Sequence, residues 1–110
     1  MTEENTSREL IWISTDWDGQ IQHVSRTACR LLGACARQSL FRYFPRHLKQ
    51  MTTDMDSALS GFPRRRTALL EPVARQPLAV EYTVSSRFTP DSVTVYWFFD
   101  FSTVNMSGAH

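Results

Sequence analysis

The stretch from Val93 to Phe101 (VTVYWFFDF) constrains the fold more than any other part of the sequence, because it is apolar on both faces. Side chains of a β-strand alternate between the two faces of a sheet. One face of this strand would carry Val93, Val95, Trp97, Phe99 and Phe101, and the other Tyr96 and Phe98. One face must pack on a core, the sequence supplies no cover for the other, and the pattern alone does not say which face is buried.

The other elements follow from local signals. β-branched and aromatic runs predict strands, at residues 10–15, 20–24, 64–71, 78–87 and 93–101. Apolar residues at helical spacing, with Ser, Gly and Pro at the ends, predict helices, at residues 25–33, 37–44 and 46–60. The Asp-Gly pair at residues 18–19 predicts a tight turn, because glycine tolerates a positive φ. Strands on both sides of a run of helices indicate an α+β domain with helices on one face of an antiparallel sheet.

Composition and charge are those of one ordinary globular domain. The chain has 110 residues, 42% of them apolar and 21% charged, which fits one core. A net charge of +1 with mixed signs gives no reason to expect a nucleic-acid or membrane partner. No apolar run approaches the roughly 20 residues that cross a bilayer, and the polar residues 1–9 lack the pattern of a signal peptide. We therefore expect a cytoplasmic protein.

Three segments and two cysteines complete this outline. We expect a tail or short helix at residues 1–9, the domain at residues 10–103, and a tail at residues 104–110 that leads to an effector outside this chain. Cys29 and Cys35 are too few to staple a secreted scaffold, and we expect both to be free thiols. They also lack a histidine at zinc-ligand spacing, so no metal site is predicted.

The motifs occur in an order that resembles the PAS domain family. The similar stretch runs from Ile11 to Ser102 and opens with a strand and an Asp-x-x-Gly turn, Asp16 to Gly19. A second strand, the small polar residue Ser25 and a helix ending in Leu31-Leu32-Gly33 follow. The family closes with a strand that ends in Asp-Ile-Thr or a variant, here Asp100-Phe101-Ser102.

This resemblance implies a five-stranded antiparallel sheet in the order 2-1-5-4-3, with helices on one face that enclose a pocket. Members of the family sense ligands, light, gases or redox state, or dimerise, and pass the result to a kinase, a cyclase or a DNA-binding domain. The chain is accordingly expected to be a non-catalytic sensing or dimerisation module of bacterial type, for example in two-component regulation. The signal would leave through Asp100, Phe101 and Ser102.

The pocket candidates lie on the helices and on the inner face of the strand at residues 78–87. They are Leu32, Phe41, Phe44, His47, Met51, Met55, Val80 and Tyr82, and all can equally be plain core. His47 is the best histidine for a haem ligand, although a half-exposed residue at a helix start explains it more simply. A Cys-Arg pair at residues 29–30 falls on the wrong element for a flavin photosensor, so flavin photochemistry is not expected. The cofactor is left open, with none as the leading expectation.

Two further surfaces carry alternatives. Leu10, Trp12, Tyr96 and Phe98 would form an uncovered apolar outer face that supports a homodimer, unless residues 1–9 cover it. The arginines at residues 64–66 should alternate between the faces of a solvated edge strand, and the alternative is that they bind an anionic ligand or partner.

A small enzyme is the second hypothesis and a scaffold without a ligand the third. An enzyme needs a buried acid or base. The helix pattern places Asp54 and Asp56 on the solvent side, and Glu81 lies on the polar face of its strand. The enzyme hypothesis therefore ranks below the sensor.

Overall fold

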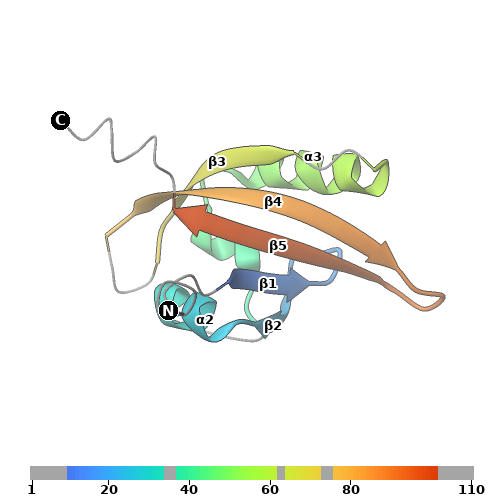
Figure 1. The fold of residues 1–110 in the computed structure, drawn as a ribbon, viewed down its shortest axis with the longest axis horizontal. Coiled ribbons are helices and arrows are strands. Elements are labelled where there is room, and N and C mark those ends of the chain that lie inside the picture. The colour runs from blue at the N-terminus through green and yellow to red at the C-terminus, as the bar shows by residue number, and fades with distance from the viewer. Residues whose placement is uncertain (1–9, 34–36, 62–63, 73–75, 102–110) are drawn as a thin grey trace, which may run out of the picture.

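A computed structural model describes residues 10–33, 37–61, 64–72 and 76–101, and it shows one sheet with helices packed against it (Figure 1). The elements are β1 (Ile11–Thr15), β2 (Ile21–Val24), α2 (Arg26–Leu32), the 3-10 helix η1 (Leu40–Tyr43), α3 (Leu48–Leu59), β3 (Arg65–Leu70), β4 (Leu78–Phe88) and β5 (Val93–Phe101). The strands pair antiparallel in the order β2-β1-β5-β4-β3. The fold class is the one that the sequence pattern predicts, and the strand order is the one that the resemblance to the PAS family implies.

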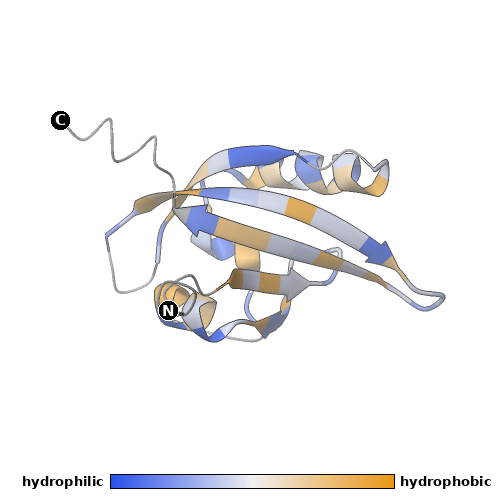
Figure 2. Cartoon of the chain, in the orientation of Figure 1, coloured by the Kyte–Doolittle hydropathy of each residue, from blue (hydrophilic) through white to orange (hydrophobic). Residues whose placement is uncertain are grey.

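The alternation along β4 and β5 decides which face of the sheet is buried. Val95 and Trp97 are fully buried, whereas Phe98 is 41% exposed. Cross-strand pairing places Ile13 of β1 and Val84 of β4 on either side of Trp97, and both are buried. Both hydrophilic and hydrophobic residues occur along the strands of the sheet (Figure 2). The helices therefore cover the Trp97 face, with α3 against β4 and α2 against β1.

Aromatic rings fill the space between this face and the helices. The Trp97 ring meets Phe41 of η1 edge-on at 6.1 Å and Tyr82 of β4 at 5.8 Å between centroids. Phe44 stacks on Phe99 at 5.7 Å. The indole N–H of Trp97 donates to the Thr15 hydroxyl at 3.0 Å, so the one polar atom of this ring is satisfied.

Turn and cap residues act as their positions predict. The Asp16 carboxylate accepts the backbone N–H groups of Asp18 at 3.0 Å and Gln20 at 2.9 Å, which holds the turn before β2. The Ser25 hydroxyl caps α2 by accepting the Ala28 N–H at 3.3 Å, and it also accepts the Trp12 N–H of β1 at 3.1 Å. Ser25 therefore joins the helix start to the sheet.

Helix α3 departs from its predicted solvent-facing side. Asp54 is buried and only 2% exposed. The prediction that Asp54 faces solvent is wrong, and the same prediction for Asp56 is confirmed because Asp56 is exposed. Polar partners on the sheet, described below, make the burial of Asp54 tolerable.

The expectation of free thiols is wrong for Cys29, which is disulfide-bonded. Cys35, the other cysteine of the sequence, lies outside the described residues. Within the described ranges, no three His, Cys, Asp or Glu side chains gather in a way that could hold a metal ion. No helix in the part of the chain that the structure describes has the length and apolarity needed to cross a membrane.

Candidate functional site

A small apolar cavity lies between α2 and the inner face of the sheet. Its volume is about 20 Å³, and three of the predicted pocket residues, Leu32, Phe44 and Val80, line it. The other lining residues are Ile11, Ile13, Ala28, Leu31, Leu70, Phe99 and Asp100. Pockets for drug-sized ligands measure about 300–1,000 Å³, so this cavity admits a guest no larger than about one water molecule or methyl group.

The remaining apolar pocket candidates pack in the core. Met51, Met55 and Tyr82 are buried, and Phe41 packs against the same cluster. None of these four lines the cavity. The sequence pattern identifies residues of the inner layer, and the structure separates those that border empty space from those that fill it.

His47 holds the edge of the sheet. It is the N-cap residue of α3, and its Nε2 accepts the backbone N–H of Leu69 on β3 at 3.0 Å. Gln50 donates to the Thr67 carbonyl of the same strand at 3.1 Å. These two bonds occupy outward-facing backbone groups of β3, which is the last strand of the sheet, and so limit its pairing with other strands. The ring nitrogen that a haem iron would need is engaged in this bond.

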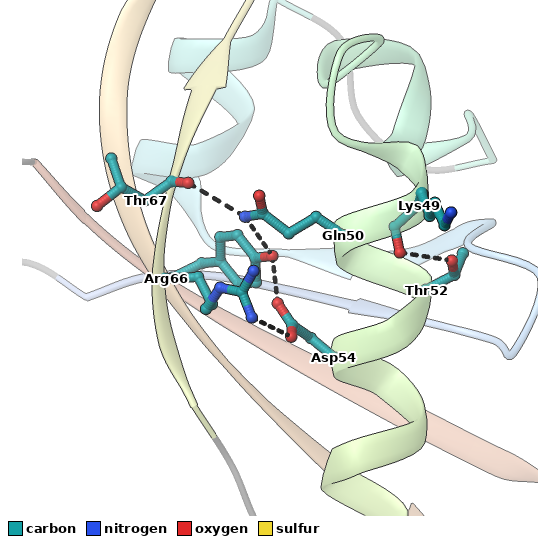
Figure 3. A network of polar contacts seen from close by, with 7 residues as sticks. Lys49, Gln50, Thr52, Asp54, Arg66 and Thr67 are labelled. Carbon is teal, nitrogen blue, oxygen red and sulfur yellow. Dashed lines mark hydrogen bonds and ion pairs between the residues drawn. The ribbon is translucent and has the colours of Figure 1, made fainter.

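Four side chains, those of Gln50, Asp54, Arg66 and Tyr82, form a polar network between α3 and the sheet, which we call the α3 network. Figure 3 shows it from close by, with Gln50, Asp54 and Arg66 labelled. The Tyr82 hydroxyl donates to one Asp54 oxygen at 2.5 Å, and Arg66 Nη1 donates to the other at 3.2 Å. Gln50 Nε2 donates to the Tyr82 hydroxyl at 3.0 Å. Both carboxylate oxygens are thus bonded, which offsets the cost of burying the charge.

Strand pairing explains why this network forms. Arg66 and Tyr82 are direct partners on β3 and β4, so they lie side by side on the face that α3 covers. Asp54 lies on α3 beside the buried Met51 and Met55. The predicted alternation of the arginines is confirmed, since Arg66 points inward to Asp54 and Arg65 points outward to Glu81 at 2.7 Å.

The Tyr82 phenol should ionise only with difficulty. Burial first, and the hydrogen bond to Asp54 second, raise the pKa of Tyr82 above its ordinary value of 10.0. A raised pKa in the folded state means that the stability contribution of this group is complete below pH 10 and is lost as the pH rises toward the folded value. The unfolding free energy is therefore expected to fall more steeply above pH 10 in the wild type than in Tyr82→Phe.

Denaturant titrations at several pH values, with phenolate absorbance followed in parallel, would check this expectation. Equal alkaline slopes for the wild type and Tyr82→Phe would contradict the buried, hydrogen-bonded phenol.

The outer face of the sheet carries an aromatic patch, which we define as Trp12, Tyr96 and Phe98. Trp12 pairs directly with Phe98 across β1 and β5, so the two side chains are neighbours on one face. Leu10, the fourth predicted interface residue, is exposed just before β1. Trp12 and Phe98 therefore lie on one surface with Tyr96, two residues from Phe98 along β5, and the opposite face of β5 packs on the core.

Two open hollows flank Phe98 on this face. One is lined by Ser85, Arg87, Tyr96 and Phe98. The other is lined by Arg65, Glu81, Thr83, Phe98, Phe99 and Asp100.

Asp100, the first predicted relay residue, lies between the inner cavity and the outer face of the sheet. It borders both the inner cavity and the second outer hollow, and Arg65 Nη2 approaches it at 3.5 Å. Phe101 is the last residue of β5, and its side chain is not among those described. Ser102 and the predicted tails at residues 1–9 and 104–110 lie outside the described residues.

Comparison with known proteins gives a match in structure alone. No protein-family model matches the sequence, and no curated protein matches it. The PAS domain of an HTR-like protein from Haloarcula marismortui superposes with a TM-score of 0.67 at 20% identity, over 91% of this chain and 99% of that chain. The chain has the PAS fold. The predicted resemblance is thereby confirmed at the level of the fold.

Two other PAS-fold structures show the range of the similarity. The PAS domain of a two-component sensor histidine kinase has a TM-score of 0.70 at 8% identity, over 92% of this chain and 93% of that chain. A light-oxygen-voltage domain studied with a flavin analogue has a TM-score of 0.69 at 10% identity, over 97% of this chain and 87% of that chain. At these identities the PAS fold is shared, while the residues that carry chemistry must be judged in this chain itself.

Proposed function

We propose that this chain is a non-catalytic signalling module that dimerises through the outer face of its PAS-fold sheet. The observation that supports this most directly is the aromatic patch at the centre of the sheet, in which Phe98 is 41% exposed and Trp12 and Tyr96 are half-buried. Aromatic side chains that remain exposed in a cluster are typical of interaction sites, and they contribute most of the binding energy where they become buried.

Substitution of Phe98 is the experiment that tests the interface. We expect the wild-type chain to dimerise in a concentration-dependent way, and Phe98→Glu to raise the dimer Kd at least about tenfold by placing a charge in an apolar contact. Sedimentation equilibrium over a range of concentrations measures both constants.

Phe88→Glu is the matched control. Phe88 is more exposed, at 63%, and lies at the far end of β4. It should leave the Kd unchanged. A wild type that stays monomeric at millimolar concentration, or an equal effect of both substitutions, would refute this interface.

For signal sensing, the residue we propose is Asp100, which borders both the inner cavity and the outer hollow that Arg65 and Glu81 also line. A small ligand or a partner would act by shifting the population of core arrangements, and β5 would transmit the shift toward a kinase, cyclase or DNA-binding domain outside this chain. A ligand larger than a methyl group requires the core to open, because the cavity of about 20 Å³ is too small for it.

Flavin does not fit the described core. The rings of Phe41, Tyr82 and Trp97 are packed against one another in the layer between sheet and helices, and the cavity is far smaller than a flavin needs. Haem at His47 would require the bond to Leu69 to break.

The enzyme hypothesis requires a buried acid or base, and Asp54 is a buried acid. However, both of its carboxylate oxygens are bonded within the α3 network. Asp54 does not border the cavity, so no substrate position is evident beside it. A scaffold without a ligand differs from the proposed module only in its response to a signal.

The cytoplasmic location stays a prediction. The disulfide at Cys29 counts against it, since disulfides persist mainly in oxidising compartments.

A further inference from the structure

We propose that two copies of this chain pair in one antiparallel register, which sets Arg87 of each copy against Glu81 and Asp100 of the other. This inference rests on the proposed dimer and adds its geometry. The occupant of the outer face is thus a second copy of the same chain, with the sheets face to face and the aromatic patch at the centre.

The charges on the outer face lie at the two ends of the sheet. Glu81 of β4 and Asp100 of β5 are direct partners at one end, and Arg65 contacts them at 2.7 Å and 3.5 Å. Among the residues that the structure describes, two acids and one base gather at this end, an excess of one acid. At the other end Arg87 is exposed and pairs across the strands with the uncharged Thr94.

The aromatic patch lies midway between these ends. Residues 81 and 87 are six positions apart on β4, about 20 Å at roughly 3.4 Å per residue. Their midpoint falls between Thr83 and Ser85, whose partners on β5 are Phe98 and Tyr96. We place a twofold axis through this point, parallel to the interface and perpendicular to the strands. Rotation about this axis sets each strand antiparallel to the same strand of the second copy, which lies directly opposite it.

This rotation makes the surface complementary to itself. It places the acidic end of one copy over Arg87 of the other, twice in each dimer. Facing sheets cross at about 30°, which displaces each end by about 5 Å, close to one strand spacing. The long Arg87 side chain can therefore reach Glu81 or Asp100, and the Asp100 side chain is 65% exposed.

The hollows agree with the same axis. The rotation sets Phe98 of one copy over Tyr96 of the other, where the hollow lined by Ser85, Arg87, Tyr96 and Phe98 opens. An aromatic ring would thus enter a space bordered by an aromatic neighbour and a cation, which is a favourable environment for it.

A charge exchange between two variants tests the register in the intact chain. Arg87→Glu and Asp100→Arg each place like charges at both symmetric contacts of a homodimer. Each variant alone should raise the dimer Kd at least about tenfold, and more at low salt. An equimolar mixture places opposite charges at both contacts, so the heterodimer should return to within about threefold of the wild-type Kd. Fluorescence energy transfer between labelled copies measures heterodimers directly, and circular dichroism checks that each variant is folded.

Each outcome is decisive. Weak homodimers that recover on mixing support the register. If Phe98→Glu breaks the dimer while both charge variants leave it intact, the face is right and the register is wrong. Weak homodimers that do not recover on mixing also overturn the register, because the charges then do not face each other. A monomeric wild type overturns both the register and the proposed dimer.

Discussion

Asp54→Ala is expected to lower the free energy of unfolding by about 3 kcal/mol, because it removes the acceptor at the centre of the α3 network. Asp54 is 2% exposed and accepts from Tyr82 at 2.5 Å and from Arg66 at 3.2 Å. Without it, the Tyr82 hydroxyl keeps only the contact with Gln50, and the Arg66 side chain, which is 34% exposed, loses its counter-charge. Urea denaturation followed by circular dichroism measures the loss.

The same helix supplies the control. Asp56 is exposed on α3, and Asp56→Ala should change the unfolding free energy by no more than about 0.5 kcal/mol. A double-mutant cycle of Asp54→Ala with Tyr82→Phe should give a coupling energy of at least about 1 kcal/mol, since the two groups are in direct contact. Equal losses for the two aspartates would show that Asp54 is hydrated in solution and that the network does not hold α3.

The network also shows where prediction from the sequence stops. A polar residue on an amphipathic helix is normally placed toward water, and Asp54 has no local signal that says otherwise. Its burial depends on Arg66 and Tyr82 being partners on adjacent strands, which is a property of strand register and not of any short motif. The pairing could have been suspected, because an arginine and a tyrosine at inward positions of a strand need a polar partner.

Features that depend on short sequence signals, such as strand alternation and helix caps, could be predicted. The alternation of side chains along β5 is enough to place Trp97 and Phe98 on opposite faces of the sheet, and the structure adds which of the two faces is buried. The caps at Ser25 and Gly33 are also where the sequence places them. The division of the pocket candidates could not be predicted, because cavity lining and filled core have the same apolar pattern. The Cys29 disulfide is equally invisible to a count of cysteines.

At Gly19, one property follows from the sequence motif and a second is visible only in the structure. Its φ of +87° is what an Asp-x-x-Gly turn requires, so the sequence motif predicts that part. The structure adds that a Cβ on Gly19 would lie 2.4 Å from Cε2 of Phe41. The Phe41 ring packs edge-on against Trp97 at 6.1 Å, so it cannot move aside without disturbing the centre of the core.

Gly19→Ala is therefore expected to cost about 2–4 kcal/mol of unfolding free energy, the sum of backbone strain and overpacking. Gly61→Ala isolates the first part, because Gly61 has a φ of +81° with nothing within 4 Å of its Cβ position. That variant should lose about 1 kcal/mol. Chemical denaturation of both variants gives the difference, which measures the contact with Phe41. Smaller side chains at position 41 should then recover part of the Gly19→Ala loss, and Phe41→Leu in that background tests it. Equal losses at Gly19 and Gly61 would mean that the turn moves freely away from the ring, and that Phe41 does not fix the start of β2 against the core.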